Sequence, residues 1–542
     1  MFGKQSIFMI YVVSCSLLID LGQCDPRQST VVSQSKANDK FRVLGVFGHP
    51  GKSHFDVFRP LLEELARKGH DVTVISYFPR DDRTSSPLPN YHDISLRNQT
   101  SDVFLNVVDL TMIQHSPISV FLELILLRSW GLKACSDGLY NPGVRKLIKS
   151  DAKFDVMITE AFNSDCFLAL AHRFNVPFIS FSSHQLMPWV NGRFSNEDNP
   201  SYIPSIFNGF GPSMTFFERV INTLTLPVIK LAYKYGFIPA MQNIVHDVFG
   251  PDVPALSEIA KNSSLVLVNT HYSLHGSKPN LPSVIELGGI HISPNVKPLP
   301  DDLQRFLDEA KEGVLYFSLG SMIKASTMPK DKLQMIVNVF RDIPRKVIWK
   351  WEAEDMPNKP KNLLIRHWLP QVAILQHPNV KCFMAHGGLL GLSESVWAGV
   401  PMIAIPMYGD QFYNAAAAKA RGVAEVLRWN DLTERDLRQA VDRVFNDSGY
   451  SLRARALAKA YNDRPESPLE TAVWWTEYIA RGNGIPYLRS AAQDLTWYQY
   501  YLLDVVFITM AVVTSSIFIV SRLVRYIFKS QNRHEKKTTK KE

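Results

Sequence analysis

Cysteine is scarce in this sequence, and the few residues are not spaced as metal ligands. The 542 residues contain five Cys, of which Cys15 lies in an apolar leader and Cys24 at its edge. Cys135, Cys166 and Cys382 remain, an odd number with no CxxC spacing. We therefore expect neither a disulfide scaffold nor a zinc site.

Net positive charge is small outside the last segment of the chain. The formal net charge is +8, but the residues after Ser521 hold eight Lys or Arg and two Glu, so this segment alone contributes +6. The remainder is close to neutral and has no basic face for a phosphate backbone. This distribution predicts that the protein has no nucleic-acid partner.

The N-terminus has the pattern of a secretory signal peptide. Lys4 precedes an apolar run from Ile7 to Leu18, and small or polar residues follow as far as Cys24. A basic start, an apolar centre and a small-residue end are typical of such leaders. We predict a signal peptide over residues 1–24.

An uncharged stretch near the C-terminus predicts a membrane anchor. Residues 505–521 hold no charge, and four Trp or Tyr residues lie between 497 and 501, where they fit an interfacial belt. This length is at the short end for a helical span. We predict a transmembrane helix over 504–521 and, by the positive-inside rule, a cytoplasmic basic tail over 522–542.

The resulting type I topology places residues from about 25 to 500 in the secretory lumen or outside the cell. Three sequons for N-glycosylation lie in this part, at Asn98, Asn262 and Asn446.

Strands and helices alternate along the rest of the chain. Residues 41–47 are expected to form a strand, 55–68 an amphipathic helix and 71–76 the next strand, which together make a βαβ unit. A second series of strands runs from 264 to 406, and the two halves are expected to join near residues 290–310. This pattern predicts an α/β protein with two Rossmann-like domains that face a cleft, with ligands at the carboxyl ends of the strands. The expected segments are an N-terminal domain over 25–290, a C-terminal domain over 291–480 and a crossover segment over 481–503.

The stretch VKCFMAHGGLLGLSESVWAGVPMIAIPMYGDQ (380–411) places a histidine and two glycines between a buried strand and a helix. The glycines allow a sharp turn, and the free N–H groups of the helix start make an anion site. Neither GxGxxG nor GxxxxGK(S/T) occurs here, which disfavours dinucleotide and Walker sites. Glycines also end strands for structural reasons alone, but that explains neither His386 nor the pair Asp410-Gln411.

Here the sequence resembles the UDP-glycosyltransferase family, most of all its membrane-bound animal members and particularly those of insects. The resemblance covers essentially the whole chain and implies the GT-B fold, with a UDP-sugar as the donor substrate. The matching residues are Trp368-Leu-Pro370-Gln371, His386-Gly387-Gly388, Glu394, Gly399-Val-Pro401 and Asp410-Gln411, with similar segments at FSLGS (317–321) and DLTWYQYYLLDV (494–505).

The resemblance implies that the C-terminal half binds the donor. Helix N–H groups and a histidine can stabilise a leaving diphosphate without a metal, so no metal or other cofactor is expected. Many vertebrate members carry Asn beside the phosphates where this chain has Leu390. The implied contacts are Trp368 and Gln371 with the nucleoside, Glu394 with the ribose, Ser321, His386 and Gly388 with the diphosphate, and Asp410 and Gln411 with the sugar.

The N-terminal half is expected to supply a catalytic base. Histidine suits the deprotonation of an alcohol near neutral pH, and His54 matches the catalytic histidine of the family whereas His49 does not. The carboxylate that orients it corresponds to Glu160, with Asp165 as the rival partner. The implied reaction is a single displacement that inverts the anomeric carbon.

The donor sugar and the acceptor are less closely defined. Vertebrate glucuronosyl members commonly carry Arg where this chain has Asn269, so glucose is favoured over glucuronate. The irregular stretch 185–241 has the aromatic residues to line a site for a small lipophilic acceptor, such as a phenol, plant metabolite, xenobiotic or steroid. A weakly active or non-catalytic paralogue that binds nucleotide sugar or a lipophilic ligand is the alternative.

The resemblance and the lysine-rich tail predict residence in the endoplasmic reticulum membrane, with the plasma membrane as the alternative, because the ending TTKKE is not a strict KKxx signal. Self-association is common in the family, so homo- and hetero-oligomers both stay open.

Overall fold

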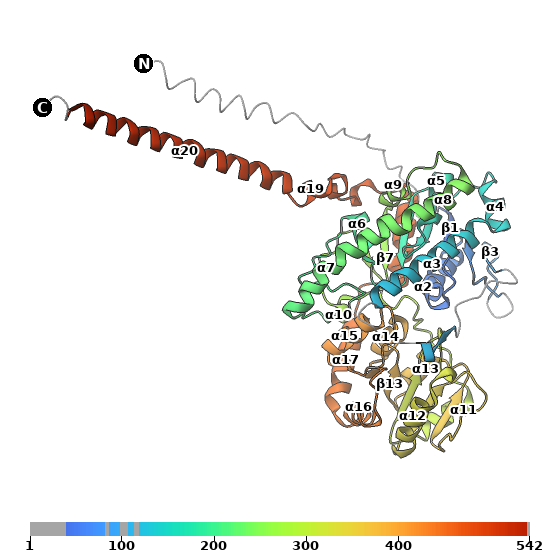
Figure 1. The fold of residues 1–542 in the computed structure, drawn as a ribbon. Coiled ribbons are helices and arrows are strands. Elements are labelled where there is room, and N and C mark those ends of the chain that lie inside the picture. Colours follow the sequence, from blue (N-terminus) through green and yellow to red (C-terminus); the bar gives the residue numbers. More distant parts are fainter. Residues whose placement is uncertain (1–38, 82–85, 98–106, 113–118, 539–542) are drawn as a thin grey trace. The chain divides into compact units, whose positions relative to one another are not determined.

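The computed structural model describes residues 39–81, 86–97, 107–112 and 119–538 (Figure 1). The predicted signal peptide, the sequon at Asn98 and the last four residues lie outside this part of the chain. All elements below belong to one unit, Lys40–Glu542.

Seven parallel strands form the first sheet, in the order β3-β2-β1-β5-β6-β7-β8. Val43 of β1 lies beside Val72 of β2 on one side and Val156 of β5 on the other. The central strands are buried at almost every position, as expected for a parallel sheet covered on both faces. The strands are β1 (Arg42–Phe47), β2 (Asp71–Ser76), β3 (Tyr91–Ser95), β5 (Val156–Glu160), β6 (Phe178–Ser182), β7 (Leu265–Val268) and β8 (Val284–Glu286).

Helix α2 (Lys52–Arg67) follows β1 and buries its apolar stripe, including Phe58, Leu62 and Leu65, against the sheet. It begins three residues before the helix expected from the apolar period, because its first residues are polar and carry no such signal. The chain leaves it at Gly69, whose φ of +93° suits glycine. The other helices of this half are α3 (Ser119–Leu139), α4 (Pro142–Ile148), α5 (Leu168–Phe174), α6 (Pro188–Phe194), α7 (Phe216–Ala232), α8 (Ile238–Phe249), α9 (Leu256–Lys261) and α10 (Tyr272–His275).

The irregular stretch that was expected to line an apolar site forms mainly α6, α7 and α8, with a π-helical turn at Tyr233–Phe237. The rings of Trp189 and Tyr233 stack at 4.2 Å, and both side chains are buried. These aromatic residues therefore build the core of the N-terminal half, which differs from the expected lining role.

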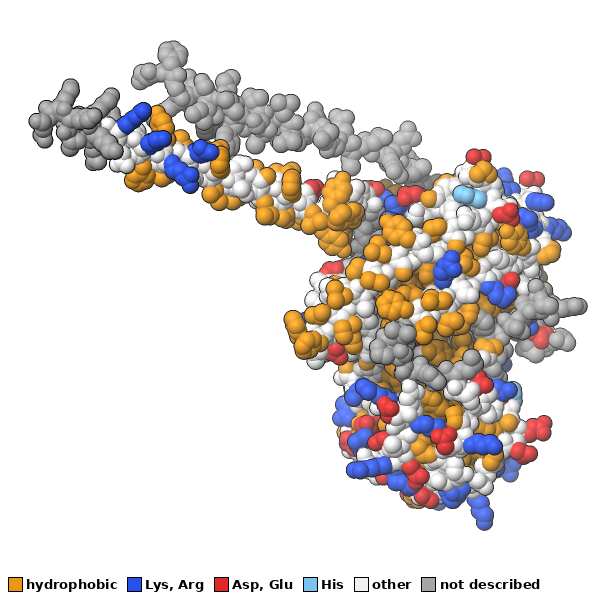
Figure 2. Space-filling model, viewed as in Figure 1, with side chains coloured by type: hydrophobic (Ala, Val, Ile, Leu, Met, Phe, Trp, Pro, Cys, Tyr) orange, Lys and Arg blue, Asp and Glu red, His pale blue; other side chains and the backbone are white. Residues whose placement is uncertain are grey.

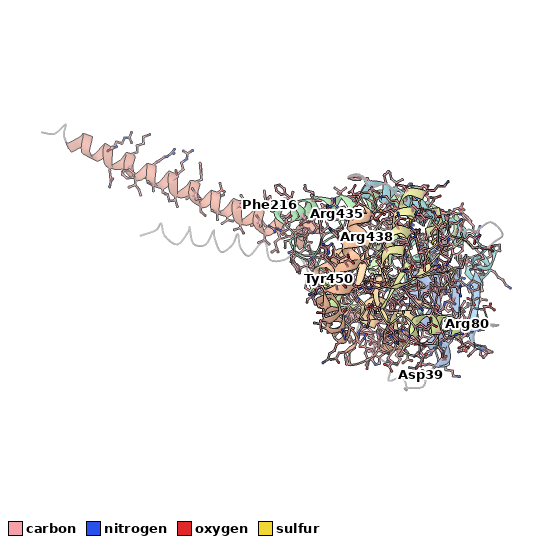
Figure 3. All side chains as sticks on the ribbon, turned by 90° about the horizontal axis from the view of Figure 1, so that it is seen from below. Asp39, Arg80, Phe216, Arg435, Arg438 and Tyr450 are labelled. Atoms are coloured by element: carbon pink, nitrogen blue, oxygen red, sulfur yellow. A yellow bond between two sulfur atoms is a disulfide. The ribbon has the colours of Figure 1, made fainter. Side chains whose placement is uncertain are left out.

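Six parallel strands form the second sheet, in the order β12-β11-β9-β13-β14-β15. Arg438 (labelled in Figure 3) lies on the helix α16 (Glu434–Asn446) and pairs at 2.8 Å with Asp342, the last residue of α12 (Lys330–Asp342). The strands are β9 (Val314–Ser318), β11 (Lys346–Lys350), β12 (Leu363–Arg366), β13 (Val380–Ala385), β14 (Met402–Ala404) and β15 (Ala424–Val426). The helices are α11 (Asp301–Asp308), α12 (Lys330–Asp342), α13 (Gln371–Gln376), α14 (Leu389–Ala398), α15 (Gln411–Ala420), α16 (Glu434–Asn446) and α17 (Ser448–Asn462).

Helix α18 (Pro468–Arg481) returns to the N-terminal half. It packs against α2 and β5, and its Ala472, Val473 and Ile479 are buried in the N-terminal core. The segment that crosses back therefore begins at Pro468, earlier than the boundary expected at residue 480. Its amphipathic pattern shows that one face is buried but not which domain buries it.

A second crossing links the halves through two short strands. β4 (Val108–Asp109) pairs with β10 (Ile323–Lys324), and Leu110 is buried in the core of the C-terminal half. Strands of two residues have no periodicity, so the sequence did not predict this pairing.

Cys135 of α3 and Cys166 form a disulfide, with Cα atoms 5.9 Å apart. The prediction from cysteine spacing did not include this bond and was wrong in that respect. Thirty-one positions separate the two residues, and only the packing of α3 on the segment after β5 brings them together. Cys382 is buried and free.

Helix α20 (Leu503–Thr538) follows the short helix α19 (Trp497–Tyr500). Its segment Leu503–Arg533 is, within the described ranges, the one helix long and apolar enough to cross a membrane, and its most apolar stretch is not buried by the protein. The span expected over 504–521 lies within it.

Apolar side chains also gather on the outside of the N-terminal half, over α3 and α7 (Figure 2). Phe216, at the start of α7, is one of them (Figure 3). The larger exposed members are Phe121, Leu122, Ile125 and Leu126 on α3 and Phe216, Phe217, Ile221 and Leu224 on α7.

Candidate active site

Polar side chains at the carboxyl ends of three neighbouring strands of the N-terminal sheet form one cluster. His54 is the third residue of α2, just after β1, and its Nδ1 lies 2.6 Å from Oε1 of Glu160, the last residue of β5. Ser183 follows β6, and its Oγ lies 3.0 Å from the same Nδ1. Since β1, β5 and β6 are adjacent, the sheet order itself brings the three side chains together.

The carboxylate of this cluster is buried and the imidazole is open on one side. The Glu160 side chain is 2% exposed and that of His54 is 18% exposed. Among the described residues, every hydrogen-bond partner of the imidazole is on Nδ1. The arrangement leaves Nε2 to face a substrate, which is the geometry that a histidine base requires.

Asp165, the rival carboxylate, has other partners. Its Oδ2 accepts hydrogen bonds from the Arg193 guanidinium and, at 2.7 Å, from the Tyr233 hydroxyl. The group is buried beneath α6 and the π-helical turn. The structure therefore brings Glu160 to His54 and Asp165 into a separate buried network.

Two further histidines and one phenylalanine surround the base. The ring centroids of His49 and His184 lie 4.4 Å and 5.6 Å from that of His54, and Phe162 lies 4.9 Å away. Burial, together with the charge of His54, lowers the pKa of His184 to about 3 and lowers that of His49 well below its usual value. Both rings are thus neutral at pH 7 and provide a weakly polar wall.

The HGG turn of the C-terminal half has a steric explanation. Gly387 has a φ of +85°, which side chains rarely adopt. A Cβ at Gly388 would overlap the His386 ring, and a Cβ at Gly320, after β9, would lie 2.6 Å from the same ring. The two glycines at 320 and 388 therefore make the slot in which the imidazole lies at the start of α14.

The imidazole of His386 is neutral at pH 7 and can form hydrogen bonds. Burial, and then the charge of Lys350, lower its pKa to about 4. Its buried Nδ1 has no hydrogen-bond partner among the described residues. Ser321 follows Gly320 at the end of the neighbouring strand β9, so the two candidate diphosphate contacts come from adjacent strand ends.

The nucleoside candidates lie after β12 and on α14. Gln371, the first residue of α13, donates from Nε2 to Glu394 Oε2 at 2.5 Å and accepts from the Tyr316 hydroxyl at 2.9 Å. His291 Nε2 lies 3.4 Å from the other oxygen of Glu394. Sequence reasoning missed His291, which stands alone in a proline-rich linker and has no motif around it.

Trp368 is the most open of these side chains, with 58% of its surface exposed. The ammonium groups of Lys350 and of Lys52, from α2, each lie 5.7 Å from its ring centroid. The indole is therefore available for stacking on a base, with a cation contributed by each half.

The sugar candidates lie where the loop after β14 meets α15: Asp410 is the N-cap residue of the helix and Gln411 is its first residue. The Oε1 atom of Gln411 accepts hydrogen bonds from the backbone of Met407 at 2.9 Å and of Tyr408 at 3.3 Å, so this amide shapes the loop. Asp410 Oδ2 accepts from Asn414 at 2.8 Å. Burial raises the pKa of Asp410, while the Asn414 amide and the charge of His54 oppose the rise. Among the charges that oppose the rise, that of His54 comes from the N-terminal half.

A cavity of about 50 Å³ lies at the carboxyl ends of β6, β7 and β8. Its lining is mixed, with Gln185, Glu197 and Lys278 beside Ile206 and Leu226, and Tyr413 of α15 closes it from the C-terminal half. The Lys278 ammonium donates to Gln185 at 2.9 Å. This lining is more polar than the aromatic surface expected from the sequence.

Two parallel, Rossmann-like sheets define the fold class of the chain as GT-B, and the solved structures agree. The chain is similar to the glycosyltransferase VinC in complex with DTDP (TM-score 0.55, 18% identity, 81% of this chain and 99% of that chain). It is also similar to CalG4, the calicheamicin glycosyltransferase (TM-score 0.52, 18% identity, 82% and 99%). At this identity the likeness defines the fold.

The sequence comparisons define the family. Residues 48–538 match the family described as UDP-glucoronosyl and UDP-glucosyl transferase, and the chain belongs to this family of UDP-glycosyltransferases. Relatives include UDP-glycosyltransferase UGT5 of Dactylopius coccus (38% identity; 89% of this chain, 91% of that protein) and UDP-glucosyltransferase 2 of the same insect (38%; 92% and 95%). UDP-glucuronosyltransferase 2B15 of Homo sapiens is 31% identical over 90% of this chain and 93% of its own length.

Proposed function

We propose that this glycosyltransferase moves a hexose, with glucose favoured, from a UDP-sugar to a hydroxyl group of a small lipophilic acceptor. The observation that carries the proposal is the His54–Glu160 pair, whose 2.6 Å contact occupies Nδ1 and leaves Nε2 without a hydrogen-bond partner among the described residues. A base beside a donor site is what transfer to a hydroxyl group requires.

The proposed reaction is a single displacement with inversion. His54 removes the acceptor proton through Nε2 while the acceptor oxygen bonds to the anomeric carbon and the bond from that carbon to UDP breaks. The Glu160 carboxylate stabilises the imidazolium that forms, and Ser183 fixes the ring orientation. The surrounding neutral rings of His49 and His184 add no second positive charge.

The leaving UDP is proposed to lie against the C-terminal strand ends. The N–H groups at the start of α14 face the diphosphate, and His386, neutral at pH 7, donates a hydrogen bond rather than a charge. Trp368 stacks on the uracil. Gln371 and Glu394, which bond to each other in this structure, exchange that bond for contacts with the nucleoside and ribose.

Asn269 supports glucose as the sugar. It is fully buried, its Nδ2 donates to the carbonyl of Ser183 at 3.0 Å, and its Oδ1 accepts from the Gly289 N–H at 3.1 Å. Both of these hydrogen bonds are with the backbone, and a neutral amide offers no ion pair to a sugar carboxylate. Relatives named for glucosyl and for glucuronosyl transfer both match this chain, so donor competition in expressed membranes is the deciding assay.

The acceptor and the location complete the proposal. A phenol, plant metabolite, xenobiotic or steroid fits an enzyme anchored beside the membranes in which such compounds dissolve, and conjugation then serves detoxification or the handling of hormones and pigments. We place the two domains in the lumen of the endoplasmic reticulum, with α20 as the single span.

The direct test is UDP release with a panel of phenols and UDP-glucose. We expect release with the unchanged protein and none above background with His54→Ala, which should still fold and bind UDP. A His54→Ala protein with the full transfer rate would refute the role of this base. If the unchanged protein binds UDP but forms none from UDP-glucose with any phenol, the non-catalytic alternative is favoured.

A further inference from the structure

An acidic side chain of the N-terminal half reaches the sugar loop of the C-terminal half. Glu123 lies near the start of α3, and its Oε1 accepts a hydrogen bond from the Gly409 N–H at 3.1 Å. Gly409 immediately precedes the sugar candidates Asp410 and Gln411. No motif marks Glu123, because the contact joins residues 286 positions apart.

The loop holds two carboxyl groups close together. Asn414 fixes Asp410 from α15, and the Gly409 N–H fixes Glu123. Burial raises the pKa of Glu123, and the charge of Asp410 adds to this rise against the effect of the hydrogen bond from Gly409. The two groups therefore sense each other electrostatically.

The described residues give these two carboxyl groups no Lys or Arg as an ion-pair partner. The nearest compensation that acts on Asp410 is electrostatic and comes from His54. Ionisation of either carboxyl group makes the pair negative. A third carboxylate brought to this loop would be repelled.

We infer that Glu123 selects the donor sugar: its carboxylate, beside Asp410, disfavours a hexose that carries a carboxylate and so favours a neutral UDP-hexose over a UDP-uronate. The inference rests on the proposed function, since it takes the loop before α15 as the sugar site. It adds a repulsive element to the missing attraction at Asn269.

The test compares kcat/KM for UDP-glucose and UDP-glucuronate with one phenol. Glu123→Gln removes the charge and keeps an oxygen that can accept from Gly409. We expect the ratio of kcat/KM for UDP-glucuronate to that for UDP-glucose to rise about tenfold, which corresponds to about 1.4 kcal/mol. Asp137→Asn is the matched control, because it removes a carboxylate from the same helix about 21 Å away along its axis, and its ratio should equal that of the unchanged protein.

A second variant separates charge from loop position. Glu123→Ala removes both the charge and the hydrogen bond, so the ratio of kcat/KM for UDP-glucuronate to that for UDP-glucose should rise in this variant as well. If the Glu123→Gln protein does not fold, the Glu123→Ala protein takes its place in the test. A rise in Ala but not in a folded Gln variant would show that loop position matters, and it would overturn the inference. An unchanged ratio in both variants, or a preference of the unchanged protein for UDP-glucuronate, would do the same.

Calorimetric binding of the two donors distinguishes this inference from the proposed function. If the unchanged protein transfers neither sugar, the proposed function fails. The role of Glu123 is then tested by the ratio of the dissociation constants for UDP-glucose and UDP-glucuronate, compared between the unchanged protein and the Glu123→Gln variant. A tenfold shift of that ratio toward UDP-glucuronate supports the inference, and equal ratios overturn it.

Discussion

Replacement of Glu160 by glutamine is the sharpest test of the proposed base. The carboxylate lies 2.6 Å from His54 Nδ1 and its side chain is 2% exposed, so the contact is a charge-assisted hydrogen bond that water does not screen. The amide of Gln can donate a hydrogen bond to Nδ1 of His54. The proton of the neutral imidazole then lies on Nε2, the atom that has to receive the proton of the acceptor hydroxyl. Glu160→Gln thus removes the charge and also favours the wrong tautomer.

The size of the effect follows from these two losses. A hydrogen bond to a charged group contributes about 1.5–3 kcal/mol, and a wrong tautomer in a Ser-His-Asp site costs up to about 10⁴ in kcat. Since Ser183 still holds Nδ1 at 3.0 Å, we expect kcat to fall by about 10² to 10³, equivalent to about 3–4 kcal/mol of activation free energy. Glu160→Asp keeps the charge at a longer distance, so its loss should be about tenfold or less.

The assay is UDP release at saturating UDP-glucose and phenol, with UDP affinity measured by calorimetry and folding by thermal unfolding. Glu258→Gln is the control, because this carboxylate of α9 is 62% exposed and far from the proposed chemistry in the chain. UDP affinity should stay unchanged in all variants. A folded Glu160→Gln protein that binds UDP and turns over at the full rate would refute the reasoning.

Three further outcomes are expected. Paired substitution of Cys135 and Cys166 by Ser should lower the free energy of unfolding by about 4 kcal/mol, since the disulfide closes a loop of 31 positions. Denaturant titration measures this free energy, and an unchanged midpoint of unfolding would contradict the prediction. Gly388→Ala should weaken UDP binding about tenfold or more, because its Cβ overlaps the imidazole before it, whereas Gly192→Ala, with nothing within 4 Å of the added Cβ, should bind normally. The folded pKa of His184, about 3, lies below its unfolded value of about 6.5, so its stabilising contribution is complete above pH 6.5 and is lost as the pH falls toward 3. Between pH 7 and 5.5 this loss is about 1 kcal/mol, and a folded His184→Gln protein should show a weaker pH dependence of unfolding than the unchanged protein.

Local patterns were enough to predict much of the molecule. The period of α2, the buried strands and the glycine turn after β13 depend on neighbouring residues, so two parallel sheets and the HGG turn could be expected from the sequence. The uncharged stretch inside α20 likewise predicted the helix that is long and apolar enough for a membrane span. His54 and Glu160 were nominated through the resemblance to the family, because the strand position alone does not distinguish His54 from His49.

Other parts of the site could not be read in this way. Ser183 lies after a buried strand in the run FSSH, and that position is a signal that could have nominated it. His291 and Glu123 had no such signal, because each acts through a contact with a distant segment. The choice between Glu160 and Asp165 was likewise open until the packing of α6 and the π-helical turn assigned Asp165 to Arg193 and Tyr233.

The amino-acid sequence by itself determined which segments become strands and helices and which residues stand at the strand ends, because periodicity and turn chemistry act over a few residues. Only the tertiary structure decided which strand ends are neighbours, that α18 returns to the N-terminal half, that Cys135 meets Cys166 and that Glu123 reaches the sugar loop. These contacts join segments far apart in the chain, and their positions depend on how whole layers pack.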